Sequence, residues 1–383
     1  MYMIFFHLYQ IALYKNEISP LVSVLIPTYN QPKFFLEALE SALSQTYQNI
    51  EILVGDDSTN EDIKNLIQPY LKKYKNLKYF YHNGKIPRGG RANVRFLINN
   101  CHGEFINYLF HDDLFYPEKI YKMMEYFTRD LDDRVSLVTS TRDAIDQNGN
   151  FIRRQGTWCP PADTVMPCEE VGRILMFTIG NFIGELTTAI FRKRDVIVKN
   201  SPQEKIYYTG TYFGIADRIY GDLSTFFNVF RKGGEFVFIA ESLSAFRHHS
   251  DQNTHKPWTK VNIPVDAMDF ILISWLNDLF LRDSEEFLYS CTKWQQYLQL
   301  FVQSIEDDDT DELKNLKNRM FELRDTISTG NYEKILDCAV RFLLDRLPED
   351  NPINNLVIKN EETGLYQKVN EVKTLCVYQK NLE

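Results

Sequence analysis

The sequence has no excess of positive charge, no paired cysteine motif and no long apolar run. Its 383 residues include 43 lysines and arginines against 52 aspartates and glutamates, which gives a formal net charge of −9. A general nucleic-acid-binding protein needs a basic surface that neutralises phosphates, so this balance argues against nucleic acid as a partner. It leaves room for a local basic pocket that holds a diphosphate.

The cysteines contain no Cys-x-x-Cys pair, and their spacing fits neither a zinc site nor a disulfide framework. The six cysteines are Cys101, Cys159, Cys168, Cys291, Cys338 and Cys376. We therefore expect reduced thiols and a cytoplasmic protein.

The segment from Met1 to Tyr14 is apolar and aromatic, but it is shorter than the roughly 20 apolar residues that span a bilayer. No basic segment precedes it and no small-residue cleavage site follows it, so a signal peptide is not expected. We assign residues 1–20 to an N-terminal extension and expect a helix that packs on the main domain. The alternative is peripheral contact with the inner face of a membrane.

Short apolar runs alternate with helix-period patterns from residue 21 to about residue 127. The β-rich runs predict strands at 22–26, 50–54, 77–81 and 104–110. Apolar residues at helical spacing predict helices at 32–45, 61–74 and 91–101. Pro117 is placed to begin another helix. This alternation predicts an α/β fold with a mainly parallel sheet flanked by helices.

Polar clusters follow three of these predicted strands, at 28–30, 56–57 and 112–113. In open parallel sheets, ligands bind at the carboxyl ends of the strands. We therefore expect the three clusters to line one site.

The second half of the chain is less regular and then becomes helical. Further strands are predicted at 135–139, 187–192 and 235–240. From Pro264 onward, apolar residues recur at helical spacing, again at 287–305 and at 313–327. A helical C-terminal region at 261–383 is expected, as a surface for a partner, a second copy of the chain or a membrane. The run Asp307-Asp308-Asp309 is expected to be a solvated loop between helices.

Five short motifs occur in a fixed order within residues 21–127. They are VSVLIPTYN at 22–30, ALSQTY at 42–47, VGDDST at 54–59, GEFI at 103–106 and HDDLFYPEK at 111–119. Together they resemble the nucleotide-sugar-binding half of family-2 glycosyltransferases, which have the GT-A fold. The resemblance continues more loosely to about Asn253. It implies a GT-A domain at 21–260, with a nucleotide-sugar-binding half at 21–127 and an acceptor half at 128–260.

The resemblance also implies a function. Such an enzyme transfers a sugar, with inversion, from a nucleoside-diphosphate donor to a hydroxyl group on a glycan. A UDP-sugar is the expected donor, and the building of cell-envelope polysaccharide is the expected setting.

The first two polar clusters are the expected nucleotide site. The first strand ends in four residues that can touch a base or a ribose: Pro27, Thr28, Tyr29 and Asn30. Asp56 and Asp57 end the second strand, where a carboxylate can accept from a uracil N–H or a ribose hydroxyl. The resemblance implies that Asp57 makes the base contact. The alternatives are a plain strand-to-helix turn and a helix N-cap, a role that aspartate fills well.

The acidic pair Asp112 and Asp113 is the metal candidate. Mg²⁺ and Mn²⁺ prefer carboxylate oxygens, and such an ion would stabilise the leaving nucleoside diphosphate. The resemblance makes Asp112 the metal ligand and places His111 and Asp113 beside the nucleotide sugar, with Asp113 as a neighbour of the metal or a second ligand. The family usually has Asp-x-Asp-Asp, and here Phe110 replaces the first aspartate, so the usual ribose contact is in doubt. The alternative is a pair that only caps the helix starting near Pro117.

An acceptor hydroxyl also needs a base, which a positioned carboxylate can supply. The family has such an acid shortly before an aromatic-rich helix, and GDLSTFF at 221–227 matches that place. The resemblance therefore implies Asp222 as the general base, with Asp217 as the alternative. A helix N-cap is the structural alternative for Asp222.

The segment at 245–253 resembles the closing loop of the family. An imidazole there can join the metal or donate to the diphosphate. The spacing favours His249, with Arg247 as a phosphate partner.

Two further groups complete the candidate site. Arg88, Arg91 and Arg95 flank Gly89-Gly90 and are candidates for holding the diphosphate, the alternative being a solvated loop. Glu185 follows a segment that resembles the acceptor side of the family and is a weaker candidate for an acceptor contact.

Two other functions remain open. A nucleotidyltransferase would share the sheet and the acidic site, but it needs a glycine-rich loop with lysine or arginine after the first strand. The sequence there is PTYNQP, at 27–32, which argues against it. A non-catalytic glycan-binding or scaffold protein on a decayed transferase is supported by Phe110 in place of the aspartate.

Overall fold

The structure is a computed structural model. It describes residues 19–155, 158–196, 198–199, 206–207, 211–212, 215–216, 221–252, 257–302, 311–347 and 352–369. The predicted helix at Met1–Tyr14, the candidate Asp217, the expected loop Asp307–Asp309 and Cys376 lie outside these residues.

Internal contacts divide the chain into two units. The first contains the chain up to Cys168 together with Asn181–Ile197 and Asn228–His249, and the second contains Glu169–Gly180, Val198–Phe227 and the chain from Ser250. This division differs from a single boundary near residue 260, because two inserted segments group with the C-terminal part.

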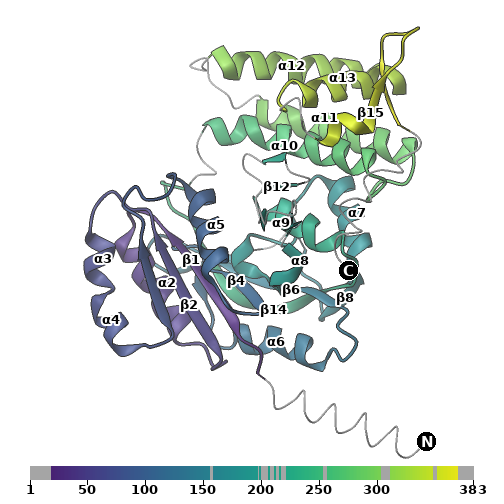
Figure 1. Ribbon diagram of the computed structural model, residues 1–383. Helices are drawn as coiled ribbons and strands as arrows, with labels where there is room; N and C mark the ends of the chain where they lie inside the picture. Colours follow the sequence, from purple (N-terminus) through teal and green to yellow (C-terminus); the bar gives the residue numbers. More distant parts are fainter. Residues whose placement is uncertain are drawn as a thin grey trace, which may run out of the picture. The chain divides into compact units, whose positions relative to one another are not determined.

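The first unit is built on one mixed sheet with the strand order β3-β2-β1-β4-β9-β6-β14-β5 (Figure 1). Its first four strands are β1 Val22–Thr28, β2 Ile50–Asp56, β3 Leu77–Tyr81 and β4 Phe105–Tyr108. They are parallel to one another. β1 and β2 are buried along their whole length, as their continuous apolar runs predict.

The other strands of this sheet bring distant parts of the sequence together. They are β5 Leu114–Phe115, β6 Val135–Ile145, β7 Phe151–Gln155, β8 Thr164–Pro167, β9 Ile190–Arg192 and β14 Glu235–Arg247. β9 is antiparallel to both β4 and β6, and β14 is parallel to β6. β6 and β14 therefore run in the same direction as β1 and β4, and the carboxyl ends of all four strands meet at one edge.

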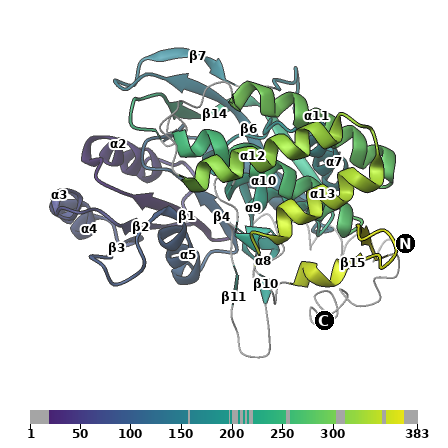
Figure 2. The ribbon, with the colours of Figure 1, turned by 90° about the horizontal axis from the view of Figure 1, so that it is seen from above.

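Helices cover the first part of this sheet. They are α2 Pro32–Leu43, α3 Asp62–Leu66, α4 Gln68–Lys73, α5 Gly90–Asn100 and α6 Lys119–Arg129. α2 and α6 bury Phe35, Leu39, Ile120 and Met123 in the same core as β1 and β2. Figure 2 shows α2 and α5 on opposite sides of β1 and β2, as expected for an α/β sheet.

Two of the predicted elements differ in the first unit. The single helix predicted at 61–74 is two helices that break at Ile67, because Pro69 lies in the first turn of α4 and has no N–H to continue α3. The strand predicted from Thr187 begins later. Leu186–Thr188 forms a 3-10 turn, η1, and β9 follows it.

The second unit is largely helical, which confirms the predicted C-terminal region. Its main helices are α10 Pro257–Leu276, α11 Ser284–Val302, α12 Asp311–Ile327 and α13 Tyr332–Leu344, together with most of α7 Cys168–Thr178 and of α9 Gly221–Phe230. α10 begins at Pro257, before the predicted start, and contains Pro264. The indole N–H of buried Trp294 donates to the carbonyl of Pro264 at 2.6 Å, which joins α11 to α10. Within the described ranges, no helix is long and apolar enough to cross a membrane.

Candidate active site

The first two polar clusters meet where β1 and β2 end. Thr28 and Asp56 are neighbours in the parallel ladder, and the N–H of Asp57 donates to the carbonyl of Thr28 at 3.1 Å. Asn30 has a φ of 49°, in the left-handed region that asparagine tolerates. Its N–H donates to Ser58 Oγ at 2.9 Å. The structure therefore brings these two predicted clusters together.

Asp56 and Asp57 have different surroundings. Asp56 is fully buried, and its two oxygens accept from the N–H of Ser58 at 2.9 Å and from the hydroxyl of Tyr79 at 2.6 Å. Both oxygens are thus used inside the protein, and Asp56 supports the loop. This geometry differs from the nucleotide contact expected of Asp56.

Asp57 lies one residue further along and connects to the arginine-bearing loop. Its Oδ2 accepts from the N–H of Gly89 at 2.7 Å. Gly89 has a φ of 117°, a conformation that favours glycine. The three predicted arginines lie in the loop before α5 and in its first turns, and they are exposed: Arg88, Arg91 and Arg95. At the end of β1, Tyr29 is 49% exposed.

The third cluster lies at the same sheet edge. Asp112 follows β4 and His249 follows β14, and His249 Nε2 lies 3.1 Å from Asp112 Oδ2. The His249 side chain is 6% exposed, and its Nδ1 is buried with no hydrogen-bond partner among the described residues. The two predicted metal ligands, far apart in the sequence, therefore form a pair.

The two neighbouring aspartates ionise differently. Burial acts to raise the pKa of Asp112, but the hydrogen bond to His249 and the nearby charge of His111 together lower it. Burial raises the pKa of Asp113 well above its usual value, and the charges of Asp112 and Glu185 add to this effect. Two carboxylates so close together cannot both ionise easily. Asp112 is therefore the more readily ionised of the two.

Asp113 joins three segments of the first unit. It is 1% exposed, and its oxygens accept from the hydroxyl of Thr187 at 2.8 Å and from the N–H of Arg247 at 3.2 Å. It therefore links the acidic turn to η1 and to the end of β14. This arrangement differs from the expected contact of Asp113 with the nucleotide sugar.

His111 connects the acidic turn to β1. Its Nδ1 lies 3.3 Å from the carbonyl oxygen of Pro27. Burial lowers the pKa of His111, although the charge of Asp112 acts in the opposite direction. His111 thus lies beside the end of β1, one of the predicted nucleotide-site segments.

Arg247 does not have the surroundings expected of a phosphate partner. Its side chain is fully buried. Its Nε donates to the carbonyl of Asp112 at 2.8 Å and its Nη2 donates to Glu37 at 2.6 Å. These internal partners differ from the phosphate contact that the sequence predicts for Arg247. The sequence does not indicate a role for Glu37, because its position in α2 is typical of a solvated glutamate on an amphipathic helix.

Glu185 is paired inside the protein. Its Oε2 lies 2.9 Å from Nε of Arg142, and the two side chains are 11% and 13% exposed. Burial raises the pKa of Glu185, although the charge of Arg142 acts in the opposite direction. Lys119 is also fully buried, and its Nζ donates to the carbonyl of Thr188 at 2.8 Å. An acceptor contact by Glu185 stays a prediction.

Asp222 lies in the first turn of α9, in the second unit. Ser224 and Thr225 follow it, and their hydroxyls donate to the carbonyl of Gly221 at 3.1 and 2.7 Å. The role of Asp222 as a base stays a prediction.

The pair Asp112 and His249 fits one divalent ion that is shared with a ligand. In the described part of the chain, no three histidine, cysteine, aspartate or glutamate side chains converge into a complete metal site. Mg²⁺ is commonly held by one or two carboxylates together with substrate phosphates. Nε2 of His249 and Oδ2 of Asp112, 3.1 Å apart, supply an incomplete donor set of this kind.

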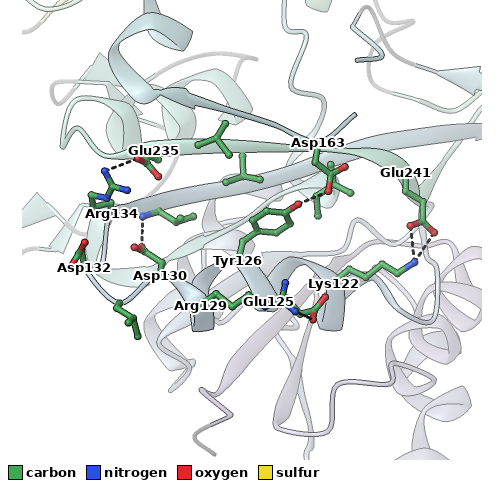
Figure 3. Close-up of a pocket in the computed structure, with 15 residues that line it drawn as sticks. Lys122, Glu125, Tyr126, Arg129, Asp130, Asp132, Arg134, Asp163, Glu235 and Glu241 are labelled. Atoms are coloured by element: carbon green, nitrogen blue, oxygen red, sulfur yellow. Dashed lines mark hydrogen bonds and ion pairs between the residues drawn. The ribbon is translucent and has the colours of Figure 1, made fainter. Parts of the chain in front are cut away.

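A separate groove of about 710 Å³ lies between α6, β8 and the first half of β14 (Figure 3). Three polar bridges cross it: Arg134 to Glu235, Tyr126 to Asp163 and Lys122 to Glu241. Most of its charged groups thus neutralise one another. It starts at the amino-terminal ends of β6 and β14, whereas Asp112 and His249 follow carboxyl ends, so it is distinct from the candidate site.

Comparison with known proteins agrees with this fold. Residues 23–197 match the model of glycosyl transferase family 2. An uncharacterized glycosyltransferase of Rickettsia typhi is 37% identical over 139 residues, which cover 36% of this chain and 41% of that protein. Chondroitin synthase of Escherichia coli is 30% identical over 139 residues, or 36% of this chain and 20% of the synthase. The match thus spans less than half the length of these relatives.

A solved structure shows the same fold at low sequence identity. TarS 1-349 of S. aureus in complex with UDP superimposes with a TM-score of 0.51 and 13% identity, over 92% of this chain and 97% of that chain. This similarity confirms the predicted GT-A fold. Residues 23–197, less than half of the chain, thus match glycosyl transferase family 2, and the fold agrees with that match.

Proposed function

We propose that the protein is an inverting glycosyltransferase that moves a sugar from a UDP-sugar to a hydroxyl group of a glycan. The observation that carries the proposal is the pairing of Asp112 with His249, 3.1 Å apart, at the sheet edge where Asp57 also lies. The family match and the UDP bound to the structurally similar TarS support a nucleotide-sugar donor.

The donor-side residues have distinct roles in this proposal. Asp112 and His249 would hold Mn²⁺ or Mg²⁺, which neutralises the charge of a diphosphate when bound. Asp57 accepts from the uracil N–H, while Tyr29 lies beside the base. The exposed arginines at 88, 91 and 95 bind the diphosphate oxygens by charge-assisted hydrogen bonds.

The acceptor-side step is a single displacement. The acceptor hydroxyl oxygen forms a bond to the anomeric carbon as the bond from that carbon to the UDP oxygen breaks. The hydroxyl proton passes to Asp222, and UDP leaves with the electron pair of the broken bond. A positioned carboxylate typically contributes about 10²–10⁴-fold to such a step.

Transfer or hydrolysis of a panel of UDP-sugars, measured as UDP release with Mn²⁺, tests the proposal. Asp112→Asn and Asp222→Asn should each lower kcat by at least about 100-fold. Asp62→Asn is the matched control, because Asp62 is an exposed aspartate in the first turn of α3. Wild-type rates in both site variants would contradict the assigned roles.

A second function, a non-catalytic protein that binds a glycan or a nucleotide sugar, is favoured by Phe110. A half-buried phenylalanine occupies the position where the family has its first aspartate, and its N–H donates to Thr187 Oγ1 at 3.2 Å. Calorimetry with UDP in the presence and absence of Mn²⁺ separates the two functions. UDP binding that does not depend on the metal, without turnover of any donor, would favour the second.

The cysteines support a cytoplasmic location for this activity. Among the described residues, Cys101, Cys159, Cys168, Cys291 and Cys338 are all free thiols. Reduced thiols are typical of the cytoplasm, where nucleotide sugars would be available as donors. We place the enzyme there, with its acceptor glycan at the inner face of the membrane.

A further inference from the structure

We propose that Arg247 is a positioning residue that holds Asp112 and His249 together, and that Glu37 on α2 anchors it. This role rests on the proposed metal and diphosphate site. It is separate from substrate binding, because the buried guanidinium has its partners inside the protein.

The guanidinium of Arg247 joins α2 to the acidic turn. Its Nε donates to the main-chain carbonyl of Asp112 at 2.8 Å, and its Nη2 donates to Oε2 of Glu37 at 2.6 Å. The position of the Asp112 main chain therefore depends on an ion pair whose acid lies on a helix of the core.

The same side chain also sets the surroundings of His249. The guanidinium lies over the ring of Phe34, 4.8 Å from its centroid. The ring of His249 lies 5.0 Å from that of Phe34, with a tilted geometry. Phe34 thus contacts both Arg247 and the imidazole, and this places the His249 Nε2 within reach of Asp112.

Two further contacts fix the backbone at this point. The N–H of Arg247 donates to Oδ1 of Asp113 at 3.2 Å, and its Nη1 lies 3.4 Å from the carbonyl oxygen of Asp146. Asp146 is in the turn between β6 and β7. Arg247 therefore joins α2, the acidic turn, the β6–β7 turn and the segment that carries His249.

Arginine suits this position for a physical reason. Its planar guanidinium presents several donors in fixed directions, so it can donate to Asp112, Glu37 and Asp146 at once. A lysine ammonium is a compact point charge and does not have this spread of donors. A buried charge also needs a partner, and Glu37 supplies it. Residues that orient metal ligands in this way typically affect metal affinity by about 10–100-fold.

The test uses Glu37→Gln in the full chain, because this change keeps the shape of a side chain that is already 35% exposed. Glu40→Gln is the matched control: Glu40 is one turn further along α2, exposed, and bonded to Tyr70 instead. We expect Mn²⁺ to bind about tenfold more weakly to Glu37→Gln than to wild type, measured by calorimetry with UDP present. UDP binding without metal should stay near that of wild type in both variants. Both should unfold in one cooperative transition, with a lower unfolding temperature for Glu37→Gln because the buried Arg247 charge loses its partner.

A second measurement needs no metal. In protein labelled with ¹⁵N-histidine, the His249 ring signals should move in Glu37→Gln and in Arg247→Lys but not in Glu40→Gln. Unchanged Mn²⁺ affinity and unchanged His249 signals in folded Glu37→Gln would overturn the positioning role. If wild type binds UDP but no Mn²⁺, the proposed metal site fails, and the His249 signals still decide whether Glu37 and Arg247 position the ring.

Discussion

The hydroxyl group of Tyr79 donates a 2.6 Å hydrogen bond to Oδ2 of Asp56, which ties the middle of β3 to the end of β2. The other oxygen of Asp56 accepts from the N–H of Ser58. The loop that carries Asp57 therefore depends on a contact from a neighbouring strand. Burial and the nearby Asp56 raise the pKa of Tyr79, so the hydroxyl keeps its proton as the donor.

Tyr79→Phe should lower the free energy of unfolding by about 1–3 kcal/mol, because it leaves a buried carboxylate oxygen without its donor. Urea unfolding at pH 7 measures this change. UDP should also bind more weakly, since Asp57 would lose its fixed position. Tyr81→Phe is the control, as its hydroxyl makes only an exposed 3.3 Å contact to the carbonyl of Asn60. Equal stability of the two variants would contradict the role of Tyr79.

Glu51 should make stability depend on pH in the acid range. Burial acts to raise its pKa, but hydrogen bonds from the main chain of His102 and from Ser23 and Lys78 lower the pKa from 4.5 to about 2. Its contribution to the free energy of unfolding is therefore complete above about pH 4.5 and is lost as the pH falls through about 2. The difference in unfolding free energy between wild type and Glu51→Gln should shrink below pH 4.5. Glu61→Gln is the control, because Glu61 is an exposed glutamate.

Removing one partner of the Arg142–Glu185 ion pair should lower the free energy of unfolding more than replacing both partners with apolar residues. Arg142→Met leaves a carboxylate with little solvent contact, and such losses typically cost about 3–5 kcal/mol. The loss should be smaller at pH 5 than at pH 8, because the pKa of Glu185 is already raised by burial and a protonated acid needs no partner. The double variant Arg142→Met/Glu185→Leu should recover much of the stability in urea unfolding. A double variant that is stable but inactive would support the acceptor contact of Glu185.

Gly103 should not tolerate a side chain. A Cβ atom there would lie 2.4 Å from Ser23 Oγ and 2.6 Å from the main-chain nitrogen of Ser23. Gly103→Ala should therefore lower the free energy of unfolding by about 1–3 kcal/mol, as overpacking typically does. Gly90→Ala is the control, because a Cβ there meets no atom within 4 Å and alanine favours a helix. A Gly103→Ala variant as stable as wild type would contradict the close approach of Gly103 to Ser23 of β1.

The sequence predicts the parallel half of the sheet well, because β1 to β4 are buried and their residues are therefore apolar. It predicts the antiparallel half poorly. β7 and β8 were not expected, since β7 is exposed, with Phe151 65% exposed, and lacks the alternation of a half-buried strand. The length of β14 also went beyond the predicted 235–240, because its later residues pair with the end of β6 in a ladder interrupted by irregular register.

The candidate site shows the same limit. Asp112 and His249 were both predicted from local motifs, but their pairing depends on the order of strands in the sheet, which spacing does not specify. The sequence favours a phosphate contact for Arg247, because arginine is mostly exposed in proteins. Only tertiary packing buries its side chain. No sequence pattern indicates a role for Glu37. Its helix position is typical of a solvated glutamate, and its partner is 210 residues away.

The place of β14 has a practical consequence for shortening the protein. The family match ends at residue 197, yet β14 lies at 235–247 and supplies the only partner strand of β5 and β8 in the described sheet. A gene truncated after residue 197 would expose the core side of β6, which packs with buried Phe236, Val237 and Ile239. The segment that matches the family model is thus shorter than the segment that the fold of the first unit requires. Expression of the first unit needs the chain at least as far as His249.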